Sequence, residues 1–137
     1  MRVVLDTNVL VSGIFFAGVP GQVLEAWADD KYELVLSPSI FDEYLQTCER
    51  LAASRPGLEY DAVLATIVGH GTLVADTDWD EPITADPDDD KFMLCARSAG
   101  ALLVSGDSDL LDVSGWQGVE VLKPRAFLDQ LGDSAAS

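Results

Sequence analysis

Carboxylate side chains in this sequence stand at positions where they could carry out chemistry together. Asp6 and Asp107 each follow an apolar run, and a dense acidic stretch occupies 86–90. Carboxylate oxygens are hard ligands that suit Mg²⁺ and Mn²⁺, so such a site needs no cysteine or histidine. Metal ions held by carboxylates can activate a water and stabilise the attacking and leaving oxygens at phosphorus. The same sequence offers no convincing Ser/His or Cys/His set for nucleophilic catalysis.

Each of these acids also has a plain structural interpretation. Asp6 and Asn8 could simply open a turn, because Asp and Asn are common turn residues. The acids of 88–90 could complement the positive end of the dipole of the helix that they begin. Helical periodicity separates two of them: Asp89 shares a face with apolar residues three, four and seven positions later, whereas Asp90 is rotated away. We therefore expect Asp89 rather than Asp90 to turn towards the sheet.

The elements that position these acids alternate between strands and helices. Residues 3–5 have the pattern of a strand buried on both faces, as found in the middle of a parallel sheet. The carboxyl ends of such strands border the crevice where ligands bind, and Asp6 lies there. Ser37-Pro38 gives a strong helix start, with Ser as the cap and Pro at the first helical position. Further strands are expected over 32–36, 72–75, 101–104 and 119–122, and helical segments over 9–16, 21–29, 38–53, 60–68, 89–99, 110–111 and 124–131.

This alternation predicts an α/β fold: a single-domain three-layer sandwich with a mainly parallel central sheet flanked by helices. With 137 residues and 48% hydrophobic content, the chain can bury a core without needing disulfides or bound metal ions for stability. We expect one domain over 1–131 and a flexible tail over 132–137. No apolar run approaches the ~20 residues needed to cross a membrane, and no signal segment precedes the first strand. Cys48 and Cys95 are expected to be buried thiols, and these features favour a cytoplasmic protein that does not bind membranes.

The charge balance limits the function classes. Lys and Arg total 8 against 24 Asp and Glu, which gives a formal net charge of −16. Because basic surfaces supply most non-specific affinity for phosphate backbones, the domain should be a poor general binder of DNA or RNA. Three alternatives follow. Either the substrate is not a nucleic acid, or metal ions and local basic residues overcome the repulsion between the acidic surface and phosphate, or a basic partner protein covers the acidic face.

Four motifs follow one another along nearly the whole chain: Leu5-Asp6-Thr7-Asn8, then Ser37-Pro38 with Glu43, then Asp86-Pro87-Asp88-Asp89-Asp90-Lys91-Phe92, then Val104-Ser105-Gly106-Asp107-Ser108-Asp109-Leu110-Leu111. In order and spacing they resemble the PIN-domain family of metal-dependent ribonucleases, which includes the toxins of VapBC-type toxin–antitoxin pairs. The closing Leu122-Lys123-Pro124 with Phe127-Leu128 is similar to one bacterial branch of that family.

The resemblance implies a PIN-like fold with an acidic pocket that holds Mg²⁺ or Mn²⁺. Carried over by position, the catalytic residues are Asp6, Glu43, Asp89 and Asp107. Of these, the implied metal ligands are Asp6, Asp89 and Asp107. The implied supporting residues are Asn8 and Ser105, with Asp86, Asp90 and Asp109 as outer acids. Ser105 stands where many members carry threonine, a change that keeps the hydroxyl group, whereas the acidic surface departs from the family.

The resemblance also implies a function: a metal-dependent endoribonuclease that cleaves single-stranded or structured RNA, as the toxin of a toxin–antitoxin pair. A basic antitoxin protein is then the expected partner, because an Arg or Lys side chain can take the place of a metal in an acidic pocket. A homodimer is also expected. Two alternatives are kept: a catalytically silent PIN-like binding module, and a receiver-type phospho-accepting switch domain. A receiver would need an acidic pair after the first strand, where this chain carries Asp6 alone.

Overall fold

Strands and helices alternate in a computed structural model that describes residues 1–57 and 59–136, without the side chains of 133–136. The strands are β1 (Arg2–Leu5), β2 (Glu33–Leu36), β3 (Thr72–Leu73), β4 (Leu102–Val104) and β5 (Val121–Leu122). The α-helices are α1 (Thr7–Phe15), α2 (Val19–Ala28), α3 (Pro38–Ser54), α4 (Asp61–His70), α5 (Asp90–Ala99), α6 (Ser108–Leu111) and α7 (Pro124–Ala136). Two 3₁₀ helices, η1 (Pro87–Asp89) and η2 (Trp116–Gly118), complete the described elements.

The strands form a five-stranded sheet in the order β3-β2-β1-β4-β5, and each pairing within it is parallel. β1 lies at the centre, where Val3 pairs with Leu34 of β2 on one side and with Leu102 of β4 on the other. Val3, Val4 and Leu5 are fully buried, so the prediction of a central strand covered on both faces is confirmed. Because the strands are parallel, their carboxyl ends share one edge of the sheet.

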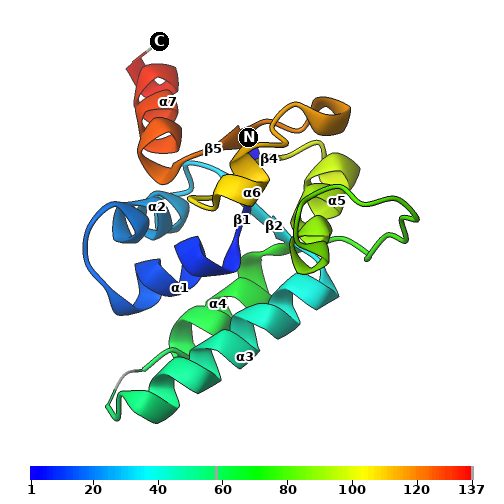
Figure 1. Cartoon of the computed structure of the whole chain (residues 1–137). Coiled ribbons are helices and arrows are strands. Elements are labelled where there is room, and N and C mark those ends of the chain that lie inside the picture. The colour runs from blue at the N-terminus through cyan, green and yellow to red at the C-terminus, as the bar shows by residue number, and fades with distance from the viewer. Residues whose placement is uncertain (58, 137) are drawn as a thin grey trace.

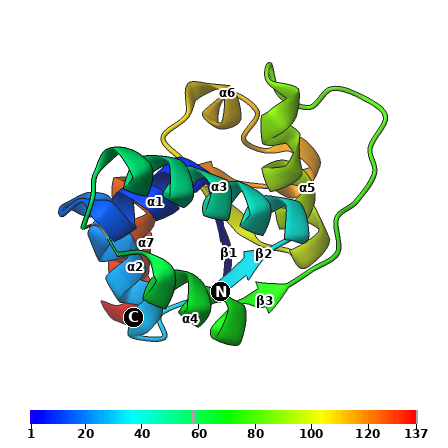
Figure 2. The ribbon, with the colours of Figure 1, turned by 90° about the horizontal axis from the view of Figure 1, so that it is seen from below.

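Helices cover both faces of this sheet and complete the predicted three-layer α/β sandwich (Figure 1). α5 packs against β1, β2 and β4. α1, α2 and α7 lie on the side of the sheet away from α5, and α2 contacts both of its companions (Figure 2). α5 ends at Gly100, whose φ of 63° lies in the left-handed region that favours glycine. The chain then turns directly into β4, which brings the site residues after that strand beside β1.

The sequence at the start of α3 explains how this helix is fixed near the carboxyl edge of the sheet. The Ser37 side chain accepts a 3.4 Å hydrogen bond from the backbone N–H of Ile40, and Pro38 occupies the first helical position, as predicted. The fully buried Tyr44 donates a hydrogen bond of 2.5 Å from its hydroxyl to the backbone carbonyl of Leu5. This bond ties α3 to the last residue of β1, one residue before Asp6.

The predicted end of the last helix is wrong. α7 continues to Ala136 and does not stop at Leu131, because one glycine lowers helix propensity without ending a helix and the alanines that follow favour it. The strands expected over 72–75 and 119–122 are also shorter than predicted. The division into a domain over 1–131 and a tail over 132–137 stays a prediction, and Ser137 lies outside the described residues.

The two cysteines are buried free thiols, as predicted. Burial raises the pKa of the Cys95 thiol to about 12, so it stays protonated at neutral pH. Within residues 1–57 and 59–136, no single helix is long and apolar enough to cross a membrane. Taken together, α1 and α2 have the length and apolar composition of a membrane-crossing segment, but the two helices are bent by 91° relative to each other.

Candidate active site

Asp6 stands where β1 ends and α1 begins. Its Oδ1 accepts a 2.8 Å hydrogen bond from the backbone N–H of Val9, so the side chain caps α1. Its Oδ2 accepts a hydrogen bond from the hydroxyl of Ser105, just after β4. Asp6 is only 4% exposed. Asp6 therefore has a local structural role as the cap of α1, and the same carboxylate lies at the edge where parallel sheets bind ligands.

Ser105 connects the ends of two neighbouring strands. Its hydroxyl donates to Asp6 and accepts a 2.9 Å hydrogen bond from the backbone N–H of Asp107. Ser105 is fully buried, and β1 and β4 pair directly in the sheet. A hydroxyl group can donate one hydrogen bond while it accepts another, so this single group links the Asp6 carboxylate to the loop that carries Asp107. Ser105 thus positions Asp107 relative to Asp6.

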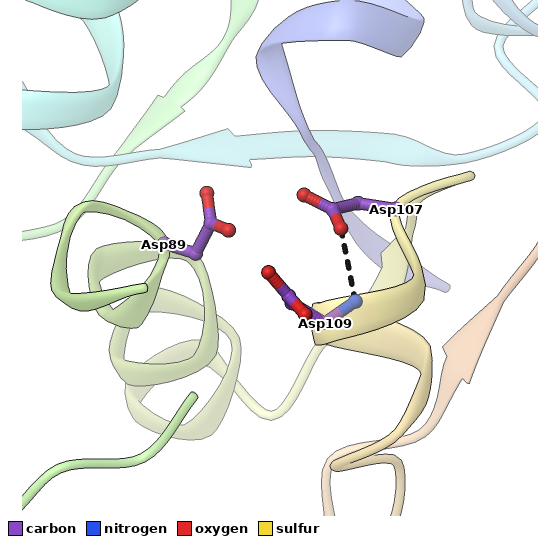
Figure 3. Close-up of side chains that lie close together, drawn as sticks. All are labelled: Asp89, Asp107 and Asp109. Atoms are coloured by element: carbon purple, nitrogen blue, oxygen red, sulfur yellow. Dashed lines mark hydrogen bonds between the residues drawn. The ribbon is translucent and has the colours of Figure 1, made fainter. Parts of the chain in front are cut away.

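Among the described residues, the carboxylates of Asp89, Asp107 and Asp109 lie close enough together to hold a metal ion. Asp107 begins α6 by accepting a 2.9 Å hydrogen bond from the backbone N–H of Asp109, and Asp89 approaches from the start of α5 (Figure 3). One oxygen from each of Asp89, Asp107 and Asp109 lies within 4.8 Å of the other two, and all three residues are partly buried. Asp109, expected as an outer acid, belongs to this cluster, whereas Asp6, expected as a metal ligand, does not.

Burial and neighbouring negative charge raise the pKa of two acids of the pocket, Asp89 and Asp6. The pKa of Asp89 rises to about 7, first because the carboxylate is desolvated and then because other carboxylates, Asp107 foremost, surround it. The pKa of Asp6 is raised mainly by burial, which its hydrogen bonds partly offset, and further by the charge of Asp107. Glu43 adds to the shift of both groups. The charges of Asp107 and Glu43 thus act on both Asp6 and Asp89, which places the four predicted catalytic acids in one acidic pocket.

Glu43 reaches this pocket from α3, and both of its carboxylate oxygens are engaged. Oε2 accepts a hydrogen bond from the hydroxyl of Thr7, in the first turn of α1. Oε1 forms a 2.7 Å ion pair with Nζ of Lys91, on α5. The same Nζ donates a 2.8 Å hydrogen bond to the backbone carbonyl of Asp88. Glu43 thus joins α1, α3 and α5 at one point.

Three of the predicted supporting residues lie outside the cluster of Asp89, Asp107 and Asp109. Asn8 is exposed on α1. Asp86 caps η1 by accepting a 3.0 Å hydrogen bond from the backbone N–H of Asp88. Asp90 turns away from the acids and accepts hydrogen bonds from the backbone N–H (2.9 Å) and the hydroxyl (2.8 Å) of Thr84. Asp90 therefore holds the loop that precedes α5, while Asp89 faces Asp107.

Two residues of the pocket, Thr7 and Lys91, are not among the sequence-predicted site residues, although both stand inside the motifs. Thr7 directly follows Asp6, and Lys91 directly follows the acidic run. A lysine ammonium group cannot ligate a cation, and a threonine hydroxyl carries no negative charge, so a prediction based on carboxylate ligands leaves both residues out. The signal that could have found Lys91 is electrostatic: a half-buried Glu43 needs a cationic partner, and this lysine stands in the first turn of a helix at the same edge.

A cavity of about 1230 Å³ opens at a different place, along α1, α2 and α4. Its lining includes Phe15, Leu24, Trp27, Tyr32 and His70, and it includes none of the predicted site acids. The acidic pocket at the carboxyl edge of the sheet, rather than this cavity, carries the groups that can perform chemistry.

Comparisons with known proteins agree with this arrangement. The family model of the PIN domain matches residues 2–109. An uncharacterized protein of Methanocaldococcus jannaschii is 27% identical over 116 residues, which cover 82% of this chain and 75% of that protein.

Two solved structures are similar in fold. A PilT N-terminus domain protein from the archaeon Sulfolobus solfataricus matches with a TM-score of 0.63 and 15% identity, covering 96% of this chain and 93% of that one. VapBC2 from Rickettsia felis, solved bound to a DNA fragment from their promoter, matches with a TM-score of 0.56 and 13% identity, covering 90% of this chain and 98% of that one.

Proposed function

Since this chain belongs to the PIN domain family, we propose that it is a metal-dependent endoribonuclease that acts as the toxin of a toxin–antitoxin pair. PIN domains are generally nucleases, which hydrolyse phosphodiester bonds. The substrate would be single-stranded or structured RNA. Water would attack phosphorus, one phosphorus–oxygen ester bond would break, and the leaving oxygen would take up a proton. The family match favours this reaction over that of a receiver domain.

The cluster of Asp89, Asp107 and Asp109 carries this proposal. One oxygen of each lies within 4.8 Å of the other two, at the carboxyl edge of a parallel sheet. The donor set fits Mg²⁺ or Mn²⁺, because these cations prefer carboxylate oxygens to sulfur or nitrogen ligands. Three partly buried negative charges this close also repel one another, and a divalent cation among them would replace that repulsion by attraction.

Each residue of the pocket has a role in this proposal. A divalent cation, when bound, supplies Lewis-acid assistance to the attack of water and to the departure of the leaving oxygen. Asp89, Asp107 and Asp109 would hold it, and Ser105 would keep Asp107 in place. Glu43 would orient the attacking water, since each of its oxygens has a further lone pair.

The role of Asp6 as a metal ligand stays a prediction. Both of its oxygens already accept hydrogen bonds, one from Val9 and one from Ser105. A carboxylate oxygen can accept more than one bond, so these contacts orient Asp6 without preventing it from facing a cation. The Asp6→Asn variant tests the assignment: as a ligand, Asp6 should be required for both cleavage and full Mn²⁺ affinity.

The net charge of −16 bears on how such an enzyme would hold RNA. The negative surface repels phosphate, so a cation in the pocket would supply the local attraction for the scissile group. RNA affinity should therefore increase when Mn²⁺ is added and fall when it is chelated. A basic partner that covers part of the acidic surface would likewise reduce the repulsion of the RNA phosphates that lie outside the pocket.

We further propose a basic antitoxin as that partner, on the basis of the fold that the chain shares with a VapBC structure. An Arg side chain fits the cluster of Asp89, Asp107 and Asp109, because its planar fork can bind carboxylates bidentately. Mn²⁺ and such an inhibitor should therefore compete. The homodimer and the cytoplasmic location expected from the sequence stay predictions.

The test is cleavage of labelled single-stranded and hairpin RNA in Mn²⁺, in Mg²⁺ and in EDTA. The wild type should cleave with either metal and not in EDTA, and Asp107→Asn should not cleave under any of these conditions. Asp129→Asn, an exposed charge removal on α7, is the matched control and should cleave like the wild type. A folded wild type that binds Mn²⁺ but cleaves no RNA would contradict the proposal and would support a silent PIN-like binding module.

A further inference from the structure

A lysine ammonium group lies inside the acidic pocket. Nζ of Lys91 is 2.7 Å from Oε1 of Glu43 and 2.8 Å from the backbone carbonyl oxygen of Asp88. The Lys91 side chain is 22% exposed and that of Glu43 31% exposed, so water screens this pair less than a pair on the open surface. The ammonium group of Lys91 is therefore held by two acceptors from different segments, Glu43 of α3 and the backbone of Asp88, as a fixed part of the pocket.

The partner of Lys91 is engaged on its other side as well. The hydroxyl of Thr7 donates to Oε2 of Glu43, so each oxygen of this carboxylate has its own donor. Glu43 would have to give up the contact with Lys91, or share an oxygen with an ammonium ion, before it could bind a divalent cation through Oε1. Two cations on one oxygen repel each other strongly at such short range.

A second metal ion would need a carboxylate beyond Asp89, Asp107 and Asp109, and the other two predicted catalytic acids of the pocket are Asp6 and Glu43. Asp6 is 4% exposed, and its two oxygens accept hydrogen bonds from Val9 and Ser105. In sites that bind two metal ions, the ions lie ~3.5–4 Å apart, so a second ion would lie close to the first. Since Asp6 alone would be a poor site for a second ion, such an ion would also need Glu43, whose Oε1 is held by Lys91.

We propose that Lys91 is a positioning residue that acts as a resident cation of the pocket: it withholds Glu43 from metal, so that the pocket binds one divalent ion, among Asp89, Asp107 and Asp109. This inference rests on the proposed function, because it concerns the same metal site. It goes beyond that function by fixing the number of ions and by assigning a task to a residue that is not itself a metal ligand.

The experiment is the stoichiometry of Mn²⁺ binding to the full chain, measured by isothermal titration calorimetry and by the loss of the free Mn²⁺ signal in electron paramagnetic resonance. The wild type should bind one Mn²⁺. Lys91→Met, which keeps the length of the side chain and removes its charge, should bind a second ion at the released Glu43. Lys91→Arg should bind one Mn²⁺, because the arginine keeps a positive charge beside Glu43. Lys123→Met, at an exposed lysine before α7, is the control and should also bind one.

Glu43→Gln gives a second, independent measurement that does not depend on whether Lys91→Met folds. Because Lys91 withholds Glu43 from the metal, this variant should keep one Mn²⁺ with an affinity within a factor of about three of the wild type. Loss of a metal-contacting or directly supporting group typically weakens affinity by about 10-fold or more. A weakening of that size in Glu43→Gln, two ions in the wild type, or one ion in folded Lys91→Met would each overturn the inference.

The same samples separate this inference from the proposed function. RNA cleavage is measured beside the Mn²⁺ titration on each protein. A wild type that binds one Mn²⁺ and cleaves no RNA removes the proposed function and leaves the role of Lys91 standing. A wild type that cleaves RNA and binds two Mn²⁺ removes the role of Lys91 and leaves the proposed function standing. A wild type that binds no Mn²⁺ overturns both.

Discussion

Crowding carboxylates in one pocket has two consequences: the carboxylates repel one another in the metal-free protein, and together they can bind a cation. Replacing Asp107 by Asn should change both properties in opposite directions. The Asn side chain has the same shape and keeps an oxygen that can accept the 2.9 Å hydrogen bond from the backbone N–H of Asp109, so α6 keeps its cap. The backbone bond from Asp107 to Ser105 does not involve the changed atoms. What the substitution removes is one negative charge from the cluster that includes Asp89.

The size of the effect follows from the separation of these charges. The carboxylate oxygens of the cluster lie within 4.8 Å of one another. Two unit charges at that distance repel by about 3.5 kcal/mol at an effective dielectric constant of ~20, and by about 0.9 kcal/mol at the dielectric constant of water. The side chains are partly exposed, and a group with a pKa of about 7, such as Asp89, relieves some repulsion by binding a proton. At pH 8 and low salt we therefore expect Asp107→Asn to stabilise the metal-free protein by about 1–2 kcal/mol. For a domain of this size, that corresponds to a rise in melting temperature of about 3–8 °C.

The assay is calorimetric melting in EDTA and in Mn²⁺. In EDTA, Asp107→Asn should melt above the wild type, and in Mn²⁺ the wild type should rise while the variant gains little, because a ligand is missing. Asp129→Asn on α7 controls for the general effect of removing one charge from a chain of net charge −16. If Asp107→Asn melts below both proteins in EDTA, its hydrogen bonds outweigh the repulsion, and the interpretation of the cluster as a cation site loses its main support.

Three further predictions concern the same pocket and its supports. Because the pKa of Asp89 is raised from 3.8 to about 7, the folded state binds more protons than the unfolded chain, and the resulting penalty grows as pH rises from about 4 through about 7. Urea denaturation in EDTA should therefore show wild type losing stability relative to Asp89→Asn across that range, and a constant difference would contradict this. Asp90→Asn should melt lower, because its carboxylate binds Thr84, yet retain more RNA cleavage than Asp89→Asn; the reverse order of activity would show that Asp89 does not serve the pocket. Tyr44→Phe should lower the free energy of unfolding by about 1–2 kcal/mol, because its buried hydroxyl donates to the carbonyl of Leu5, and an unchanged urea midpoint would refute that account.

The order of elements and the placement of some acids could be predicted from the sequence because both depend on local patterns. The run of apolar residues in β1 indicates a strand buried on both faces, and alternation with helices then requires a parallel sheet. A parallel sheet in turn assigns Asp6 and Asp107 to one edge. Helical periodicity separates Asp89 from Asp90 for the same reason, since residues three or four positions apart share a face. These inferences use only the residue pattern within each element and the order of the elements along the chain.

The contacts between elements were decided by the tertiary structure alone. Glu43 stands at the flank of the apolar stripe of α3, and only the resemblance to PIN domains selected it. Its partners lie 36 residues away at Thr7 and 48 residues away at Lys91, on helices whose relative placement no local pattern specifies. The same holds for Asp109, which joins Asp89 only because α6 faces the start of α5 across the sheet edge. A pattern along the chain records which face a residue occupies, whereas the packing of helices on a sheet determines which faces meet and so which charges must be paired.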